Sequence, residues 1–235
     1  MIVPLERRSG VAYIAVGADL LASAQAGAAG IAATVVEPAA LVLGSAQPDS
    51  DVAHGACAAA GLTVIRRGTG GGAVLCDSGV LLIDIAVPRG HALATEDVTE
   101  AYRPLGSALA VALRVLAVPC RTVTVTEARQ TDDDRRSAAR RACWAGLSPY
   151  EIVLDDDRKL VGLAQRRRSG AVLFQIAVPV SSAPRDVARY LLRREEIDAW
   201  LTSSASLVEV PACLLITPDA LWEHLRGSLE QLLRD

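Results

Sequence analysis

The chain has 235 residues, enough for one large domain with a sizeable hydrophobic core. Hydrophobic residues make up 51% and charged residues 22% of it, which predicts a folded rather than a disordered protein. The net charge of −3 gives no electrostatic argument for nucleic acid or an anionic membrane. An aromatic content of 3% also disfavours base-stacking surfaces.

Targeting segments and metal sites are not expected. The first ten residues have no apolar run after their charges, and the apolar stretch 26–46 is interrupted by Glu37, Pro38 and glycines. We therefore expect a cytoplasmic protein without a membrane partner. The five cysteines form no Cys-x-x-Cys pair and the three histidines are scattered, so neither a disulfide framework nor a metal centre is predicted.

The first half of the chain alternates helical and extended patterns. Alanine and leucine content, apolar runs and glycine stops predict a helix at 18–30, a strand at 39–44, a short helix at 54–61 and a strand at 62–67. Two strands are predicted within 73–88, around the turn Asp77-Ser78-Gly79. A longer helix follows at 95–118, capped by Thr95 or Asp97, with Pro104 in its first turn or at a kink.

The second half begins with a charge run at 129–142, which we interpret as a mobile surface loop. Three strands are predicted next, at 149–154, 159–164 and 170–180, with 155–158 as a hairpin turn. The last 50 residues are predicted to be mostly helical, at 185–201 and 218–235. The pattern indicates an α+β fold with a mixed, largely antiparallel sheet flanked by helices, formed by residues 1–235 as a single domain.

A glycine-rich loop, "RRGTGGGAV", interrupts these elements at 66–74. Its spacing formally fits a dinucleotide fingerprint, but the residues that follow are typical of strands, whereas the fingerprint needs a helix. A phosphate-binding P-loop is excluded because no Gly-Lys-Ser/Thr follows. A plain turn explains one or two glycines, whereas four in five residues favour close approach of backbone amides to a ligand.

The chain contains 23 arginines and a single lysine, Lys159. Arginine supplies nearly every surface cation in this chain, so a lone lysine does not fit the pattern of an ordinary surface cation. An ammonium is a compact point charge with three donors, whereas a guanidinium is wide and planar. We therefore treat Lys159 as a candidate functional residue, at a position that needs a compact cation rather than a guanidinium.

Three segments in order resemble the lipoate-protein ligase and octanoyltransferase family. "VIRRGTGGGAVLCDSG" is similar to the family's Arg-Arg-x-Ser-Gly-Gly-Gly-Ala-Val segment, and "RKLVGLAQRRRSGAVLFQ" to the segment that carries its catalytic lysine. "ACWAGLSPYEIVL" resembles the loop in which its transferases carry a cysteine nucleophile, and "ALVLGSAQ" a strand end of the family. The chain departs from the family at Cys76, where histidine is usual.

The resemblance implies a class II synthetase-like fold, here a catalytic domain without an accessory C-terminal domain. It makes Lys159 and Cys143 the expected catalytic residues. It also implies a substrate-binding set formed by Arg67, Thr69, Gly70, Gly71, Gly72, Ala73, Val74, Gly162 and Ala164. No metal ligands are expected.

The implied activity is transfer of an octanoyl or lipoyl group to a lysine of a lipoyl-domain protein, through an acyl-enzyme on Cys143. An acyl carrier or another lipoyl protein would be the donor, and no tightly bound cofactor is expected. Two alternatives stay open. One is a ligase that uses ATP and magnesium and forms lipoyl-AMP, and the other is a non-catalytic protein that binds acyl groups or carriers.

Overall fold

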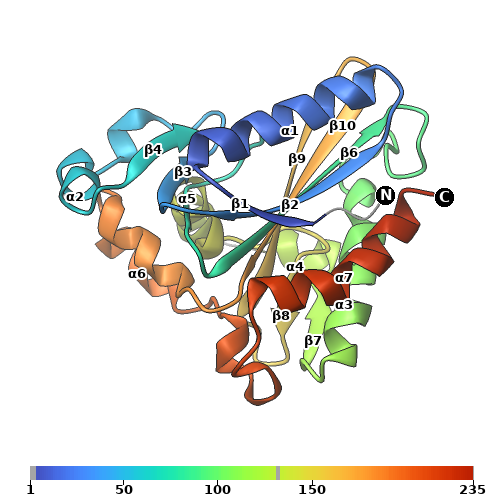
Figure 1. The fold of residues 1–235 in the computed structure, drawn as a ribbon. Coiled ribbons are helices and arrows are strands. Elements are labelled where there is room, and N and C mark those ends of the chain that lie inside the picture. Colours follow the sequence, from blue (N-terminus) through green and yellow to red (C-terminus); the bar gives the residue numbers. More distant parts are fainter. Residues whose placement is uncertain (1–3, 131–132, 235) are drawn as a thin grey trace.

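The computed structural model describes residues 4–130 and 133–234 (Figure 1). Its strands are β1 (Leu5–Arg8), β2 (Gly30–Val36), β3 (Ala40–Leu43), β4 (Thr63–Arg66), β5 (Val74–Cys76), β6 (Val80–Pro88), β7 (Cys120–Thr122), β8 (Ile152–Leu154), β9 (Lys159–Arg168) and β10 (Ala171–Pro179). Its α-helices are α1 (Gly10–Gln25), α2 (His54–Ala59), α3 (Arg103–Val115), α4 (Val125–Arg129), α5 (Asp133–Arg141), α6 (Glu195–Leu201) and α7 (Pro218–Leu232).

A seven-stranded sheet in the order β1-β2-β6-β10-β9-β8-β7 forms the centre of the fold. The pair β1–β2 is parallel and every other neighbouring pair is antiparallel. A second sheet, in the order β4-β3-β5, lies beside it. The expected α+β class with a mixed, largely antiparallel sheet is therefore confirmed.

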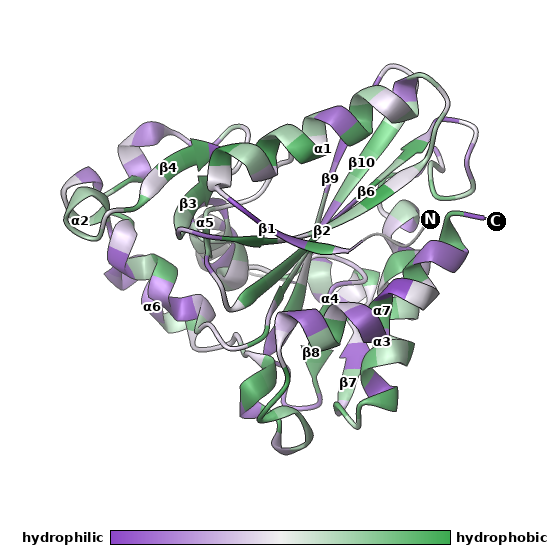
Figure 2. Cartoon of the chain, in the orientation of Figure 1, coloured by the Kyte–Doolittle hydropathy of each residue, from purple (hydrophilic) through white to green (hydrophobic). Residues whose placement is uncertain are grey.

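Helices cover both faces of the large sheet. Helix α1 crosses one face, over β2, β6 and β10, while α3 and α7 lie against each other beneath the opposite face (Figure 1). The larger hydrophobic core lies between the sheet and these two helices, with Leu109, Phe174 and Trp222 among its members. The central strands are accordingly the most hydrophobic part of the molecule, and the outer helices are mixed (Figure 2).

The charge run at 129–142 is not the mobile loop that the sequence suggested. Residues 131 and 132 lie outside the described residues, but helix α5 occupies Asp133–Arg141. Its Ala138 is buried in a second core cluster, which also holds Trp144. Polar residues dominate the segment because only one narrow stripe of the helix meets the core.

Three predicted helices begin or end elsewhere. The helix expected at 18–30 is α1, which begins at Gly10 and ends at Gln25, and Gly30 already begins β2. The helix expected from residue 95 starts at Arg103, with Pro104 in its first turn, and Asp97 instead accepts hydrogen bonds from the amides of Thr99 and Glu100 in the preceding turn. The helix expected at 185–201 is divided into a 3₁₀ segment, Pro184–Tyr190, and α6. Between them Leu191 forms a β-bridge with Val52, which requires extended backbone.

Candidate active site

Lys159, the first residue of β9, is buried, with 2% of its surface exposed. Its ammonium forms an ion pair with Glu151 at 2.8 Å and donates hydrogen bonds to the carbonyl oxygens of Cys143 and Gly146, each at 3.0 Å. The same nitrogen lies 5.5 Å from the ring centroid of Trp144. All three N–H donors therefore have acceptors within the protein, and two of them fix the loop that carries Cys143.

Glu151 is the functional candidate that sequence reasoning missed. Its carboxylate, 1% exposed, accepts hydrogen bonds from the amides of Ser148 and Leu163 at 2.7 and 3.0 Å as well as from Lys159. One buried side chain thus joins the loop after Cys143, the lysine and the middle of β9. A lone glutamate between "SPY" and "IVL" carries no motif, so only its three-dimensional contacts identify it.

Cys143 begins a single 3₁₀ turn, Cys143–Ala145, directly after α5, and is partly exposed. Its amide donates to the carbonyl oxygen of Ala73 at 3.0 Å, and the amide of Ala73 donates to Arg141 at 2.8 Å. Residues 73 and 142 form a parallel β-bridge. The end of the glycine loop and the start of the cysteine loop are therefore held together by backbone hydrogen bonds, although 70 residues separate them in sequence.

The glycine loop turns its carbonyl groups inward. The Arg67 guanidinium donates to the oxygens of Gly70 and Gly72 at 2.8 and 2.9 Å, and the Gly71 oxygen lies against the backbone of Gly44. Gly71 has φ +95°, a conformation that strains other residues, and a side chain at Gly72 would collide with the backbone of α5. In the described part of the chain, the amides of residues 70–72 donate to no acceptor, which suits an anion or a polarised carbonyl.

A buried polar network fixes this loop to the large sheet. Arg67 Nε donates to Thr69 Oγ1 at 2.9 Å, and the Thr69 hydroxyl donates to Gln175 Oε1 at 2.6 Å. The amide nitrogen of Gln175 donates in turn to Tyr13 and to Asp84, at 3.0 and 2.6 Å. Thr69 keeps the hydroxyl that the family's serine has, and that hydroxyl supports the loop from behind.

Asp84 is fully buried, and burial raises the pKa of its carboxyl to about 7. The folded protein therefore holds this proton where the unfolded chain, with the ordinary pKa of 3.8, has lost it. Stability should consequently fall as the pH rises from about 4 to about 7 and level off above that range. We expect Asp84→Asn, whose carbonyl still accepts from Gln175, to be more stable than the wild type at pH 8 and to gain little at pH 4.

Urea unfolding of both proteins at pH 4, 6 and 8 measures this difference directly. A gap in unfolding free energy that stays constant across the three pH values would show that Asp84 does not titrate in this range.

A narrow, mainly apolar pocket lies between the two sheets. Strands β3, β5, β6, β9 and β10 contribute its walls. The residues that line it are Tyr13, Val42, Arg67, Val74, Cys76, Leu82, Cys143, Gly162, Leu163, Ala164, Gln175, Ile176 and Ala177. A β-carbon at position 162 would lie 3.6 Å from the Trp144 ring, an ordinary van der Waals contact.

A more open hollow adjoins the pocket. Its lining includes Gly70, Gly71, Gly72, Tyr102, Arg140, Cys143, Glu151, Lys159, Leu163, Ala164 and Gln165. Cys143, Leu163 and Ala164 line both spaces, so the thiol stands where the pocket meets the hollow. Every site residue expected from the sequence lines the pocket or the hollow except Thr69 and Ala73, which contact lining residues through hydrogen bonds.

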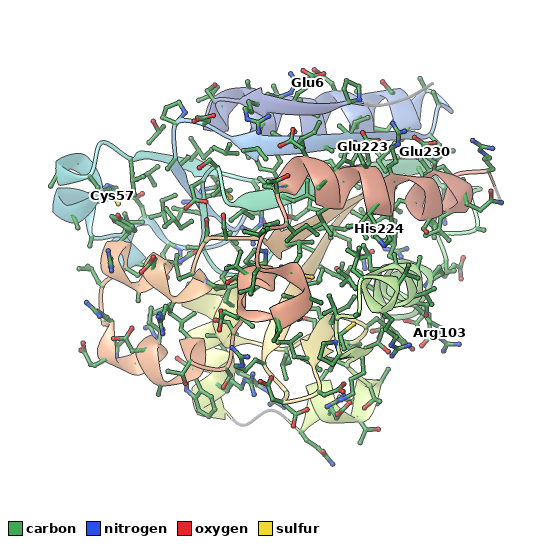
Figure 3. All side chains as sticks on the ribbon, turned by 60° about the horizontal axis from the view of Figure 1, so that its bottom comes forward. Glu6, Cys57, Arg103, Glu223, His224 and Glu230 are labelled. Carbon is green, nitrogen blue, oxygen red and sulfur yellow. The ribbon has the colours of Figure 1, made fainter. Side chains whose placement is uncertain are left out.

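The other cysteines and the histidines lie outside this junction or within the core. Cys57, Cys120 and Cys213 are buried, as expected, and Cys76 is buried in the pocket wall, where desolvation raises its pKa to about 12. Figure 3 shows His224 on α7, where its ring nitrogen contacts the Ala112 carbonyl at 2.7 Å. Among residues 4–130 and 133–234, no group of three or more His, Cys, Asp or Glu could hold a metal ion.

Comparison with known proteins places this site in a family. The octanoyltransferase LipM of Moorella thermoacetica is 38% identical over 113 residues, which cover 48% of this chain and 39% of that protein. LipM of Exiguobacterium sibiricum is 31% identical over 147 residues, covering 62% of this chain and 52% of the relative. The matched segments thus span about half or less of the curated relatives.

Solved structures share the fold. The bipartite lipoate protein ligase of Thermoplasma acidophilum, reported with its E2 lipoyl domain, has a TM-score of 0.74 at 18% identity, covering 100% of this chain and 84% of that one. Lipoate-protein ligase A bound with ATP has a TM-score of 0.73 at 18% identity, with 100% and 86% covered. No helix in the described part of the chain is both long and apolar enough to cross a membrane.

The family description of the lipoyl protein ligase A/B catalytic domain matches residues 15–209, which include the glycine loop, Cys143 and Lys159. The chain therefore belongs to the lipoyl protein ligase A/B catalytic domain family.

Proposed function

We propose that the protein is an acyltransferase of protein lipoylation, which moves an octanoyl or lipoyl group onto the acceptor lysine of a lipoyl domain through a thioester on Cys143. The observation that carries this proposal is the position of the Cys143 thiol, at the junction of an apolar pocket and an open hollow beside Lys159. The pocket suits an aliphatic chain, and the hollow gives an acceptor access to the thioester. LipM relatives are named octanoyltransferases.

The reaction has two steps. The Cys143 sulfur attacks the donor's thioester carbonyl, forms a new carbon–sulfur bond and releases the donor thiol, which receives the proton that Cys143 loses. The acceptor amine then attacks the acyl-enzyme, an amide bond forms, and the proton of the amine returns to the Cys143 sulfur. Both steps pass through a tetrahedral intermediate whose oxygen needs donors.

Two groups that line the hollow can stabilise the negative charge on that oxygen. The amides of residues 70–72, which line the hollow, donate to no acceptor in the described part of the chain, and the Lys159 ammonium supplies positive charge in the same hollow. Lys159 also holds the Cys143 carbonyl, so it acts on the reacting thiol's position as well as on charge. Direct contact between Lys159 and the acyl oxygen would require one of its present hydrogen bonds to open.

The same amides also favour the second candidate, an ATP-dependent ligase, because a phosphate of an acyl-adenylate would fit an anion site. Such an enzyme would use ATP and magnesium and hold lipoyl-AMP without a covalent bond to Cys143. The transferase is the better-supported reading because it gives the cysteine at the junction a role. A protein that only binds acyl groups would give neither Cys143 nor Lys159 a catalytic role.

Incubation of the purified protein with a small octanoyl thioester, without ATP, tests the proposal. Intact-mass spectrometry should show an increase by one octanoyl group that hydroxylamine removes, and an apo lipoyl domain should then receive the group. Transfer that requires ATP and proceeds without an acyl-enzyme would establish the ligase instead.

A further inference from the structure

A second hollow lies at the far end of the β9–β10 hairpin and is lined by three arginines. Arg89, Arg167 and Arg168 contribute to it together with one carboxylate, Glu96, and three small or apolar residues. Three guanidinium groups around one small space repel one another unless an anion lies between them. The hollow therefore has the charge of a site for carboxylate or phosphate oxygens.

The hydrogen bonding of these arginines is incomplete. Arg89 and Arg168 are exposed, and in the described part of the chain their guanidinium groups have neither a hydrogen bond nor an ion pair. Arg167 donates to Gln165 and to the Thr95 carbonyl, yet its second terminal nitrogen is buried without any acceptor. A buried donor without an acceptor is costly, so the Arg167 guanidinium has hydrogen-bonding capacity that the described residues do not fill.

This hollow is connected to the candidate active site. Gln165, which accepts from Arg167 Nε at 2.9 Å, itself lines the open hollow beside Cys143. Ala164, at the pocket junction, and Arg167 are three residues apart on one extended strand, or about 10 Å. Arg167 is therefore linked to the open hollow through Gln165, and Arg168 follows it on the same strand.

We infer that the hollow formed by Arg89, Arg167 and Arg168 is a docking site for carboxylate side chains on the acceptor protein. The inference rests on the proposed function. A lysine amine sits on a stem of only four carbons, so the surface around the acceptor lysine must lie against the enzyme when the amine reaches Cys143. Exposed arginines near the open hollow can then form ion pairs with acidic residues that flank the acceptor lysine. These ion pairs would fix the position of the acceptor protein on the enzyme.

The test separates the two steps of transfer. The double variant Arg89→Gln/Arg168→Gln removes two exposed, unpaired charges and should fold normally. Acylation of Cys143 by a small octanoyl thioester should be unchanged, whereas the concentration of apo E2 lipoyl domain that gives half-maximal single-turnover transfer should rise about fivefold to tenfold. The increase should shrink at high salt, because salt already screens the wild-type contact.

Two matched variants sharpen the result. Glu96→Gln removes the carboxylate that opposes an acidic partner, so it should lower the half-saturating acceptor concentration. Arg185→Gln removes an exposed arginine of the 3₁₀ segment Pro184–Tyr190 that is also unpaired among the described residues, and should change nothing. Unchanged acceptor dependence in the double variant, or weaker binding with Glu96→Gln, would overturn the inference.

A direct binding measurement keeps this inference distinct from the proposed activity. Fluorescence anisotropy with labelled apo E2 lipoyl domain should show weaker binding to the double variant even if no acyl-enzyme forms. Thermal stabilisation by inorganic phosphate that the double variant loses, with acceptor binding unaltered, would make the hollow a small-anion site and contradict the docking role.

Discussion

Replacing Cys143 with alanine is expected to abolish the acyl-enzyme and to reduce ATP-independent transfer by about 10³-fold or more, as loss of a catalytic nucleophile does. The reason is that Cys143 is the thiol at the junction of the pocket and the open hollow, where an acyl chain and an acceptor can meet. Intact-mass spectrometry after incubation with an octanoyl thioester, together with single-turnover transfer, measures both effects. The variant should remain folded, because the side chain is partly exposed.

Cys76→Ala is the matched control. Cys76 lies in the same pocket, but burial raises its pKa to about 12, so it stays a neutral thiol at physiological pH. The Cys76→Ala protein should still gain the octanoyl group. Label carried by Cys76 alone would refute the assignment of the nucleophile, and ATP-dependent lipoyl transfer by Cys143→Ala would establish a ligase.

Lys159→Met is expected to reduce the free energy of unfolding by about 3–5 kcal/mol and to abolish transfer. The substitution leaves the Glu151 carboxylate buried without its cation and frees the carbonyl groups of Cys143 and Gly146. Urea unfolding and acyl-enzyme formation report the two losses separately. A stable Lys159→Met protein with normal transfer would mean that the lysine is incidental.

The double variant Lys159→Met/Glu151→Gln distinguishes structure from chemistry. Glutamine removes the unpaired charge and keeps one oxygen. Ser148 and Leu163 donate to different carboxylate oxygens, so this oxygen replaces one of the two acceptors and part of the lost stability should return. Activity should not return, because the ammonium is still absent. Recovery of both would assign Lys159 a purely structural role.

Lys159→Arg is expected to reduce stability as well as activity. An exposed lysine could be exchanged for arginine without harm to the fold. Here the ammonium fits among three acceptors at 2.8 to 3.0 Å in a buried site, and the wider guanidinium does not. Some loss of stability should therefore accompany the loss of activity.

The central strands could be predicted because their residues are buried on both faces and read as apolar runs. This holds for β6 and β10, and the hairpin turn before β9 is marked by its aspartates. Strand β1, with the sequence Leu-Glu-Arg-Arg, is an edge strand whose polar residues hide its pairing with β2. Strand β2 was missed because alanine and glycine begin it, and both are poor strand formers outside a tertiary context.

The residues of the candidate site likewise fall into those that the sequence identifies and those that it does not. Residues that the chemistry restricts, such as Cys143, Lys159 and the glycines, carry motifs, and the structure brings them together. Glu151, Gln175 and Tyr13 act by closing a hydrogen-bond network between distant elements, and any of several side chains can do so. Nothing in the linear pattern around these three residues reveals their partners.

The distribution of amino groups in the chain has a consequence for the proposed acyl-enzyme. The one ε-amine of the whole chain belongs to Lys159, which is buried and holds three acceptors. Guanidinium groups, which supply the remaining cationic side chains, stay protonated and are poor nucleophiles. In the proposed reaction these 235 residues thus present no exposed lysine side chain to a neighbouring thioester, so acylation of their own lysines would not compete with transfer to the acceptor.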